Sequence, residues 1–281
     1  MTGQRTLQLL RTTLWSLLSF TVLFCILSAF KSLINPYPDD YVNGIIVNYA
    51  NLLLNKGCYF LPINSYPFVH AAYPPVFITL TAICFKLFGS SFFIIRALSI
   101  VSTILMSIAL YICIQKATAN KMLAVFSALI FLTPSFMYDW ISAGRVDTLA
   151  ILFSLLGLYL YFSDNKKIFW PIALFTLAFY TKHSVIAAAG AVFLDQLLIR
   201  KDFRRSLTFA AMLSGAILSI LAVGSLLTQG QFFLHLFTYT KVAGIELQVA
   251  LTKYIRFFRQ SNMFYLPKLW TLKHINNNFI M

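Results

Sequence analysis

Acidic residues are scarce in this chain: Asp and Glu together number 8 of 281 residues, against 22 Lys and Arg. Charged residues of both signs make up only 11% of the sequence and hydrophobic residues 59%, which excludes the composition of an ordinary soluble domain. The basic residues lie mostly between long apolar runs, where they set membrane topology, so the net charge of +14 does not indicate nucleic-acid binding. We therefore expect an integral membrane protein without a nucleic-acid partner.

Cysteines are also few, and their spacing does not indicate a metal site or a disulfide pattern. None of the four forms a C-x-x-C pair or has a histidine at metal-ligand spacing, which argues against a zinc site and against a disulfide framework. They are Cys25, Cys58, Cys84 and Cys113.

The first apolar run follows Arg11 and continues to Lys31 without a charge. It lacks a small-x-small cleavage site, so it predicts a retained membrane span rather than a removable signal. Arg5 and Arg11 before it predict a cytoplasmic N-terminus. We expect the protein to lie in the plasma (inner) membrane.

Short basic clusters indicate how often the chain crosses the bilayer. If all of them are cytoplasmic, each interval between two clusters contains an even number of crossings. The clusters are Arg5/Arg11, Lys116/Lys121, Lys166/Lys167 and Arg200/Lys201/Arg204/Arg205. The resulting prediction is an all-α, polytopic membrane protein of about seven transmembrane helices: 12–33, 92–115, two within 122–165, two within 168–199 and 206–228.

Between the first two spans, the same parity places residues 34–91 outside. The apolar stretch 75–89 then cannot cross, and we expect a helix lying in the outer interface. We assign residues 1–230 to a transmembrane catalytic module and 231–281 to an outer-face amphipathic tail, either complete or truncated, with a surface helix at 251–260.

With this topology, the polar side chains of the outer face form one short group. Ionisable residues at the ends of membrane spans are costly and are candidates for function. The group comprises Asp39, Asp40, His70, Tyr73, Arg96, Asp139, Arg145, Asp147, Lys182 and His183.

Asp39 and Asp40 follow Pro36 and Pro38, which end the first span and hold the next residues extended. Either the pair is a solvated turn after a helix, or it ligates a metal and accepts a proton, since divalent cations prefer oxygen ligands and a general base needs a carboxylate. The sequence leaves both interpretations open.

Arg145 and Asp147 stand two residues apart at the outer start of the fourth span. They form either a local ion pair at a helix start or a phosphate-binding arginine beside a third site carboxylate. Lys182 is either an interfacial lysine or a cation facing the same cavity, and Tyr73 is either a loop aromatic or a site residue. His183 is better explained as a polar residue at a helix end.

Four segments of the chain, taken in order, resemble the GT-C superfamily of membrane glycosyltransferases. They read PDDY, AAYPPVFITLTAICFKLFGSSFFIIRALSI, SAGRVDTLAILFSLLGLYLY and LAFYTKHSVIAAAGAVF. The likeness covers residues 12–245 and is closest to bacterial lipid-linked-sugar transferases related to protein O-mannosyltransferases and to lipid A aminoarabinose transferases.

This resemblance implies roles for three acidic residues. The family's acidic pair, commonly Asp-Glu, falls on Asp39 and Asp40, with Asp39 as base or metal ligand. The acid of the second outer loop falls on Asp147. Asp39 and Asp147 are then the expected ligands of a divalent metal cation.

The resemblance also implies which residues bind the donor phosphate. Arg145 falls at a phosphate-contact position, and the Thr181-Lys182 pair places Lys182 there as well. Tyr73 stands before the helix-opening proline, where relatives commonly have Lys or His.

The expected function is transfer of a sugar from a polyprenyl-phosphate donor to a hydroxyl-bearing lipid, glycan or protein on the outer face of the membrane. Its partners are the lipid-linked sugar and membrane lipid, and the sequence does not determine the oligomeric state. The alternative is a catalytically silent or truncated lipid-binding subunit. A secondary transporter fits less well, because the charges gather at span ends and no half-to-half repeat is visible.

Overall fold

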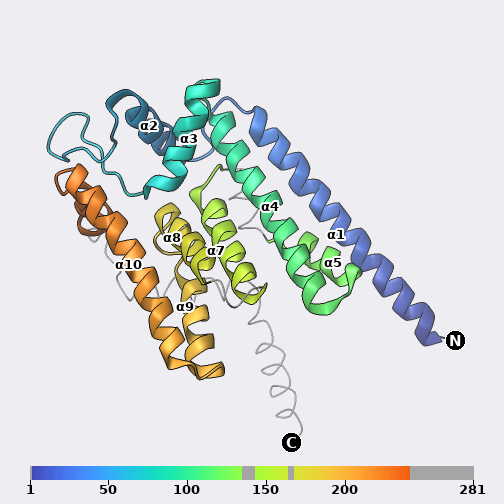
Figure 1. Cartoon of the computed structure of the whole chain (residues 1–281). Coiled ribbons are helices and arrows are strands. Elements are labelled where there is room, and N and C mark those ends of the chain that lie inside the picture. The colour runs from blue at the N-terminus through green and yellow to red at the C-terminus, as the bar shows by residue number, and fades with distance from the viewer. Residues whose placement is uncertain (1, 135–142, 164–167, 241–281) are drawn as a thin grey trace, which may run out of the picture. The chain divides into compact units, whose positions relative to one another are not determined.

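The computed structural model describes residues 2–134, 143–163 and 168–240, and every regular element in these ranges is helical (Figure 1). The all-α membrane class expected from the sequence is confirmed. The elements are α1 (Thr2–Ile34), α2 (Tyr41–Lys56), α3 (Pro75–Phe88), α4 (Phe92–Thr118), α5 (Lys121–Ile130), α7 (Val146–Ser163), α8 (Phe169–Thr181), α9 (Ala187–Leu194), the π-helix η1 (Asp195–Ile199), α10 (Phe203–Leu227), α11 (Gln231–Phe233) and the π-helix η2 (Leu234–Thr238).

Helices occupy the described part of each predicted span. In the described ranges, four are long and apolar enough to cross a membrane: α1, α4, α7 and α10. The other three predicted spans correspond to shorter apolar helices, namely α5, α8, and α9 continued by η1. Crossing of the bilayer by these three stays a prediction, as does the interfacial position of α3.

Sequence reasoning did not predict α2, which lies between the first predicted span and α3. Its buried side chains Val42, Ile46 and Tyr49 recur at three- and four-residue intervals, the spacing of one helix face. Asp40 caps its first turn by accepting a hydrogen bond from the Val42 N–H, and Gly57 ends it with a left-handed φ of 71°. The helix therefore begins at the acidic pair.

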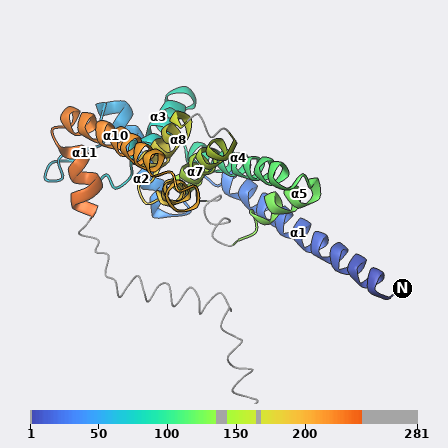
Figure 2. The same cartoon turned by 60° about the horizontal axis from the view of Figure 1, so that its bottom comes forward.

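Contacts between neighbouring helices hold the described spans together. Helix α7 packs against α4 on one side and α8 on the other, while α1 runs beside α4 and α5 (Figures 1 and 2). At Gly157 of α7, an added Cβ would lie 2.7 Å from the Phe175 ring of α8, so only glycine permits this close approach.

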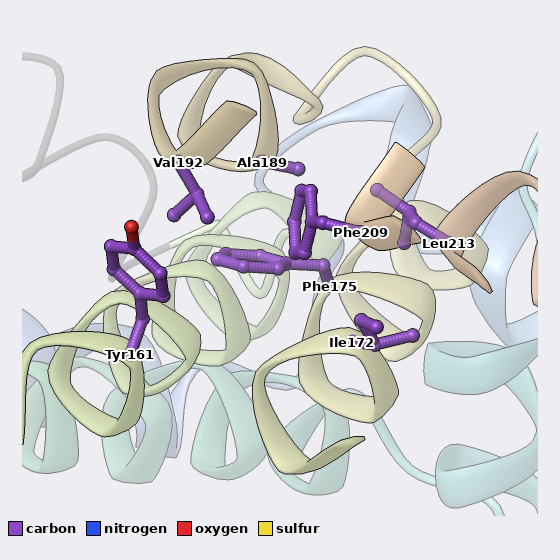
Figure 3. Close-up of a cluster of buried hydrophobic side chains, with 7 residues drawn as sticks. All are labelled: Tyr161, Ile172, Phe175, Ala189, Val192, Phe209 and Leu213. Carbon is purple, nitrogen blue, oxygen red and sulfur yellow. The ribbon is translucent and has the colours of Figure 1, made fainter. Parts of the chain in front are cut away.

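A buried apolar cluster joins α7, α8, α9 and α10 (Figure 3). The Phe175 and Phe209 rings pack edge to face, with their centroids 6.1 Å apart. The cluster comprises Tyr161, Ile172, Phe175, Ala189, Val192, Phe209 and Leu213. It fixes α8, whose C-terminal end leads into Lys182.

The chain divides into two compact units, Met1–Leu236 and Phe237–Met281. Of the second unit, residues 237–240 are described. The predicted surface helix at 251–260 lies outside the described residues, as do Asp139 and the Lys166/Lys167 cluster.

Candidate active site

The connection between α1 and α2 wraps around the guanidinium of Arg96, a residue of α4 that is fully buried. Arg96 donates hydrogen bonds to the backbone carbonyls of Ser32, Asn35 and Tyr37. Its Nη2 also lies 2.9 Å from the Oδ2 of Asp39. A buried arginine thus uses the backbone of the connection, together with one carboxylate, as its hydrogen-bond acceptors.

Asp39 is held by hydrogen bonds as well as by charge. Ser32 Oγ donates to its Oδ2 at 2.9 Å, and Asn35 Nδ2 donates to its Oδ1 at 2.8 Å. Its backbone N–H donates to Asn43 Oδ1 at 3.2 Å, and Asn43 Nδ2 donates to the carbonyl of Ala143. The two hydrogen bonds of the Asn43 side chain therefore join the α1–α2 connection, which carries Asp39, to the loop that precedes α7.

Asp40 has two roles in the structure. One carboxylate oxygen caps α2, and the other pairs with the guanidinium of Arg145. The sequence left a turn and a functional site as alternatives for the acidic pair; the cap confirms the turn for Asp40, and its functional role stays a prediction. Its side chain is 18% exposed, against 30% for Asp39, so Asp39 is the more accessible of the two.

The loop before α7 lies tightly against α4 because of Gly144. This residue has a φ of 59°, and an added Cβ would lie 3.1 Å from the backbone nitrogen of Arg96. One turn further along α4, Ser99 Oγ donates to the carbonyl of Arg145 at 2.8 Å. These backbone contacts fix the position of Arg145 next to the acidic pair.

Asp147 lies in the first turn of α7, where a carboxylate suits the helix dipole, and its side chain is 10% exposed. It pairs with the ammonium of Lys182, the residue that ends α8. The close packing of α8 against α7 brings the two together across 35 residues of sequence. The sequence offered Arg145 as an ion-pair partner for Asp147, but Arg145 pairs with Asp40 instead.

Tyr73 belongs to the same group of charges. Burial raises the pKa of its phenol, and Tyr41, Asp147 and Asp40 raise it further, whereas the positive charge of Arg145 lowers it. The Tyr73 phenol therefore interacts electrostatically with Asp40 of the α1–α2 connection and with Asp147 of α7. A half-buried phenol that keeps its proton can donate a hydrogen bond to an anion.

The loop 57–74, which carries Tyr73, is fastened by His235 of η2. The imidazole is fully buried, its Nδ1 accepts a hydrogen bond from the Ala71 N–H at 3.0 Å, and its Nε2 lies 2.7 Å from the carbonyl oxygen of Leu61. Because that oxygen can only accept, the proton is on Nε2. Tyr59 also fixes this loop, since its hydroxyl donates to the Tyr73 carbonyl at 3.0 Å.

All six sequence-predicted site residues therefore lie in the described part of the chain. The pKa interactions of Tyr73 reach Asp40, Arg145 and Asp147. Asp39 instead pairs with Arg96 and is joined to the loop before α7 through Asn43. Arg96 was one of the polar residues of the predicted outer face but received no role. Its signal in the sequence was a lone charge four residues into an apolar span, a position that is costly unless the charge is paired. Of the remaining outer-face residues, His70 is exposed and His183 is half-buried beside Lys182.

The predicted divalent cation at Asp39 and Asp147 stays a prediction. Each of these carboxylates already pairs with a cationic side chain, and Asp40 does so as well. The described residues contain no group of three or more His, Cys, Asp or Glu that could hold a metal ion. Because all three carboxylates are occupied by cationic side chains in this arrangement, we assign no step of the reaction to a divalent cation.

Comparison with known proteins gives one match. Residues 72–227, more than half of the chain, match the family described as dolichyl-phosphate-mannose-protein mannosyltransferase. This segment contains Tyr73, Arg96, Arg145, Asp147 and Lys182, whereas the acidic pair lies before it. No curated protein and no solved structure matches the chain significantly.

Proposed function

Since the chain belongs to the dolichyl-phosphate-mannose-protein mannosyltransferase family, we propose that it transfers a sugar from a polyprenyl-phosphate donor to a hydroxyl-bearing acceptor on the outer face of the membrane. Membership makes it a membrane glycosyltransferase that uses a lipid-linked sugar. The polyprenyl carrier, the hydroxyl acceptor, the outer face, the inner membrane and the cytoplasmic N-terminus are parts of the proposal.

One observation carries this proposal. Three carboxylates, two from the α1–α2 connection and one from the first turn of α7, lie with three cationic side chains where α1, α4, α7 and α8 begin or end. A transferase for a lipid-linked sugar needs both signs of charge at the membrane surface, because the reacting bond joins a sugar to a phosphate whose lipid tail stays in the bilayer.

In the proposed reaction, the acceptor hydroxyl attacks the anomeric carbon and gives its proton to Asp39. The new bond joins the acceptor oxygen to that carbon, while the bond from the carbon to the phosphate oxygen breaks, and the polyprenyl phosphate leaves with the electron pair. Asp39 is assigned as base because its side chain is the most exposed of the three carboxylates.

Arg145 and Lys182 are assigned to the departing phosphate. Their side chains are 34% and 31% exposed, so they are accessible to a ligand. The Nε of Arg145 is buried and has no hydrogen-bond partner among the described residues, so the exposed part of the guanidinium is what can reach an anion. Tyr73 is assigned to the same phosphate as a hydrogen-bond donor, because its half-buried phenol keeps its proton.

The proposal is tested by assaying the purified protein in lipid vesicles with a polyprenyl-phosphate sugar and candidate hydroxyl acceptors. The variant Lys182→Gln should reduce transfer about 10²-fold, the loss expected for one group that stabilises charge in a transition state. The matched control is Lys86→Gln, which removes the exposed lysine in the last turn of α3 and should leave transfer unchanged. Donor binding without transfer by the wild-type protein would support the silent lipid-binding subunit.

A further inference from the structure

A groove runs between α4 and α7 toward the ends of these helices that lie away from the carboxylates. It consists of two adjoining cavities of about 180 and 500 Å³, both lined by Tyr159. Side chains of the smaller cavity include Leu105 and Ile112 on α4 and Leu152 on α7. The larger one continues to Lys116 and Ser163, near the ends of the two helices.

The two cavities differ in chemistry. The smaller is lined by apolar side chains and the ring of Tyr159, whereas the larger contains the ammonium of Lys116. Lys116 donates a hydrogen bond to the Tyr159 hydroxyl, and its Nζ lies 4.7 Å from the centre of that ring. No carboxylate in the described ranges forms an ion pair with Lys116. One end of the groove is thus cationic and the rest is apolar.

The position of Lys116 along α4 relates the groove to the bilayer. Arg96 and Lys116 lie on the same helix, 20 residues apart. At a rise of about 1.5 Å per residue, their backbones are separated by about 30 Å, close to the thickness of the hydrocarbon core. Lys116 therefore lies at the membrane surface opposite to the carboxylates.

We propose that this groove, which we call the α4–α7 groove, binds an anionic phospholipid of the surrounding bilayer. The lipid phosphate pairs with Lys116, and one acyl chain lies along Ile112, Leu105 and Leu152. An anionic headgroup and an alkyl chain match the two ends of the groove in charge and in polarity. The occupant is not the sugar donor, because the donor presents its phosphate to the carboxylate site at the other surface.

Occupancy of the α4–α7 groove links two helices that carry site residues at their other ends, Arg96 on α4 and Asp147 on α7. A ligand that binds the folded protein raises its stability by mass action. Only the exclusion of the sugar donor as occupant rests on the proposed function, since lipid binding can be measured without donor or acceptor.

The experiment counts bound lipid by native mass spectrometry, after delipidated protein is mixed with equal amounts of phosphatidylglycerol and phosphatidylcholine. Wild-type protein should retain phosphatidylglycerol in preference. The variant Lys116→Gln should weaken its retention roughly fivefold, the effect of one lysine near an anionic surface. The variant Lys121→Gln is the matched control, because Lys121 belongs to the same basic cluster but does not line the α4–α7 groove, and it should bind as wild type does.

A second variant tests the apolar part of the groove. Ile108 lies on α4 between Leu105 and Ile112 and is 49% exposed, so tryptophan can be placed there without repacking a core. Ile108→Trp should fill the cavity and displace the lipid while keeping the helical circular dichroism spectrum. Equal retention of the two lipids by the wild type, or equal losses in Lys116→Gln and Lys121→Gln, would overturn the proposal.

Discussion

Arg96 is fully buried and bonds both to Asp39 and to the backbone on the α1 side of it, so one side chain positions the first carboxylate of the site and shapes the loop that presents it. The pair joins residues 57 positions apart in sequence. A buried cation costs free energy unless it is paired, so neither partner is independent of the other.

The first prediction concerns the loss of this carboxylate. Asp39→Asn should reduce sugar transfer by about 10²–10⁴-fold, because the base is removed. It should also lower the free energy of unfolding by about 1.5–3 kcal/mol, since Arg96 stays charged and buried but loses the carboxylate that balances its charge. Asp40→Asn should cost less activity, because asparagine still caps α2. Transfer assays and thermal unfolding in detergent measure the two effects separately.

A double variant distinguishes catalysis from structure at this position. Adding Arg96→Gln to Asp39→Asn removes the unpaired buried charge, so the two stability losses should be less than additive. If Asp39 is the base, transfer stays low although stability is partly restored. Recovery of transfer together with stability would make Asp39 a structural residue and would contradict the proposed mechanism.

The second prediction concerns the metal. Since Asp39 and Asp147 are both paired with cationic side chains, a divalent cation would have to displace Arg96 and Lys182 from them. We therefore expect transfer to stay within about twofold of its initial rate in excess EDTA, with positive side chains neutralising the phosphate. Loss of transfer on chelation, restored by added Mg²⁺ or Mn²⁺, would instead establish the cation site expected from the family resemblance.

How much of this arrangement the sequence could predict depends on the range of the interactions. The C-terminal end of α1 and both ends of α4 and α10 follow from apolar runs and from the charges and glycine beside them, so reasoning from local pattern places them within a few residues. The start of α1 does not follow, since the helix begins at Thr2 and the predicted span at residue 12. The acidic and basic members of the site also follow, because a charge at the edge of an apolar run is conspicuous. Which charge pairs with which does not follow, since Asp40 and Arg145 meet only through packing across 105 residues.

Helix α2 shows a second reason why the sequence predicts only part of the structure. Its sequence is interrupted by Gly44 and by Asn43, Asn48 and Asn51, which weaken the apolar pattern of a helix. In the structure, Asn43 is fully buried and bonds to the Ala143 carbonyl of a loop 100 residues away. A polar residue whose hydrogen-bond partner is distant in sequence favours a loop prediction, and the sequence pattern alone does not identify that partner.

The third prediction tests the topology. In a protein whose native cysteines are replaced, a cysteine at Asn64, exposed in the loop between α2 and α3, should react with an impermeant thiol reagent added outside intact cells. A cysteine at Thr118, exposed at the last residue of α4, should react only after the cells are opened. Labelling of both positions in intact cells would contradict the assignment of the carboxylates to the outer face.

The fourth prediction concerns pH and His235. Burial lowers the pKa of this imidazole below its ordinary value of 6.5, and the neighbouring His70 lowers it further, although the bond to the Leu61 carbonyl opposes the shift. In the unfolded chain, the same group takes up a proton near pH 6.5. Between its folded pKa and 6.5, the unfolded state therefore binds more protons than the folded state, and the free energy of unfolding falls as the pH falls.

Thermal unfolding of the wild-type protein between pH 7.5 and 5.5 should thus show a decreasing melting temperature. His235→Asn keeps an acceptor for the Ala71 N–H but cannot be protonated, so it should be less stable at pH 7.5 and should show a weaker pH dependence. Burial and Lys182 also lower the pKa of His183, which accounts for a remaining slope in this variant. His70→Asn is the matched control and should keep most of the wild-type slope, because the exposed ring of His70, which stacks on that of His235 with the centroids 6.0 Å apart, lowers the pKa of His235 less than burial does. An unchanged slope in His235→Asn would show that protonation of this residue does not limit the stability of the loop that carries Tyr73.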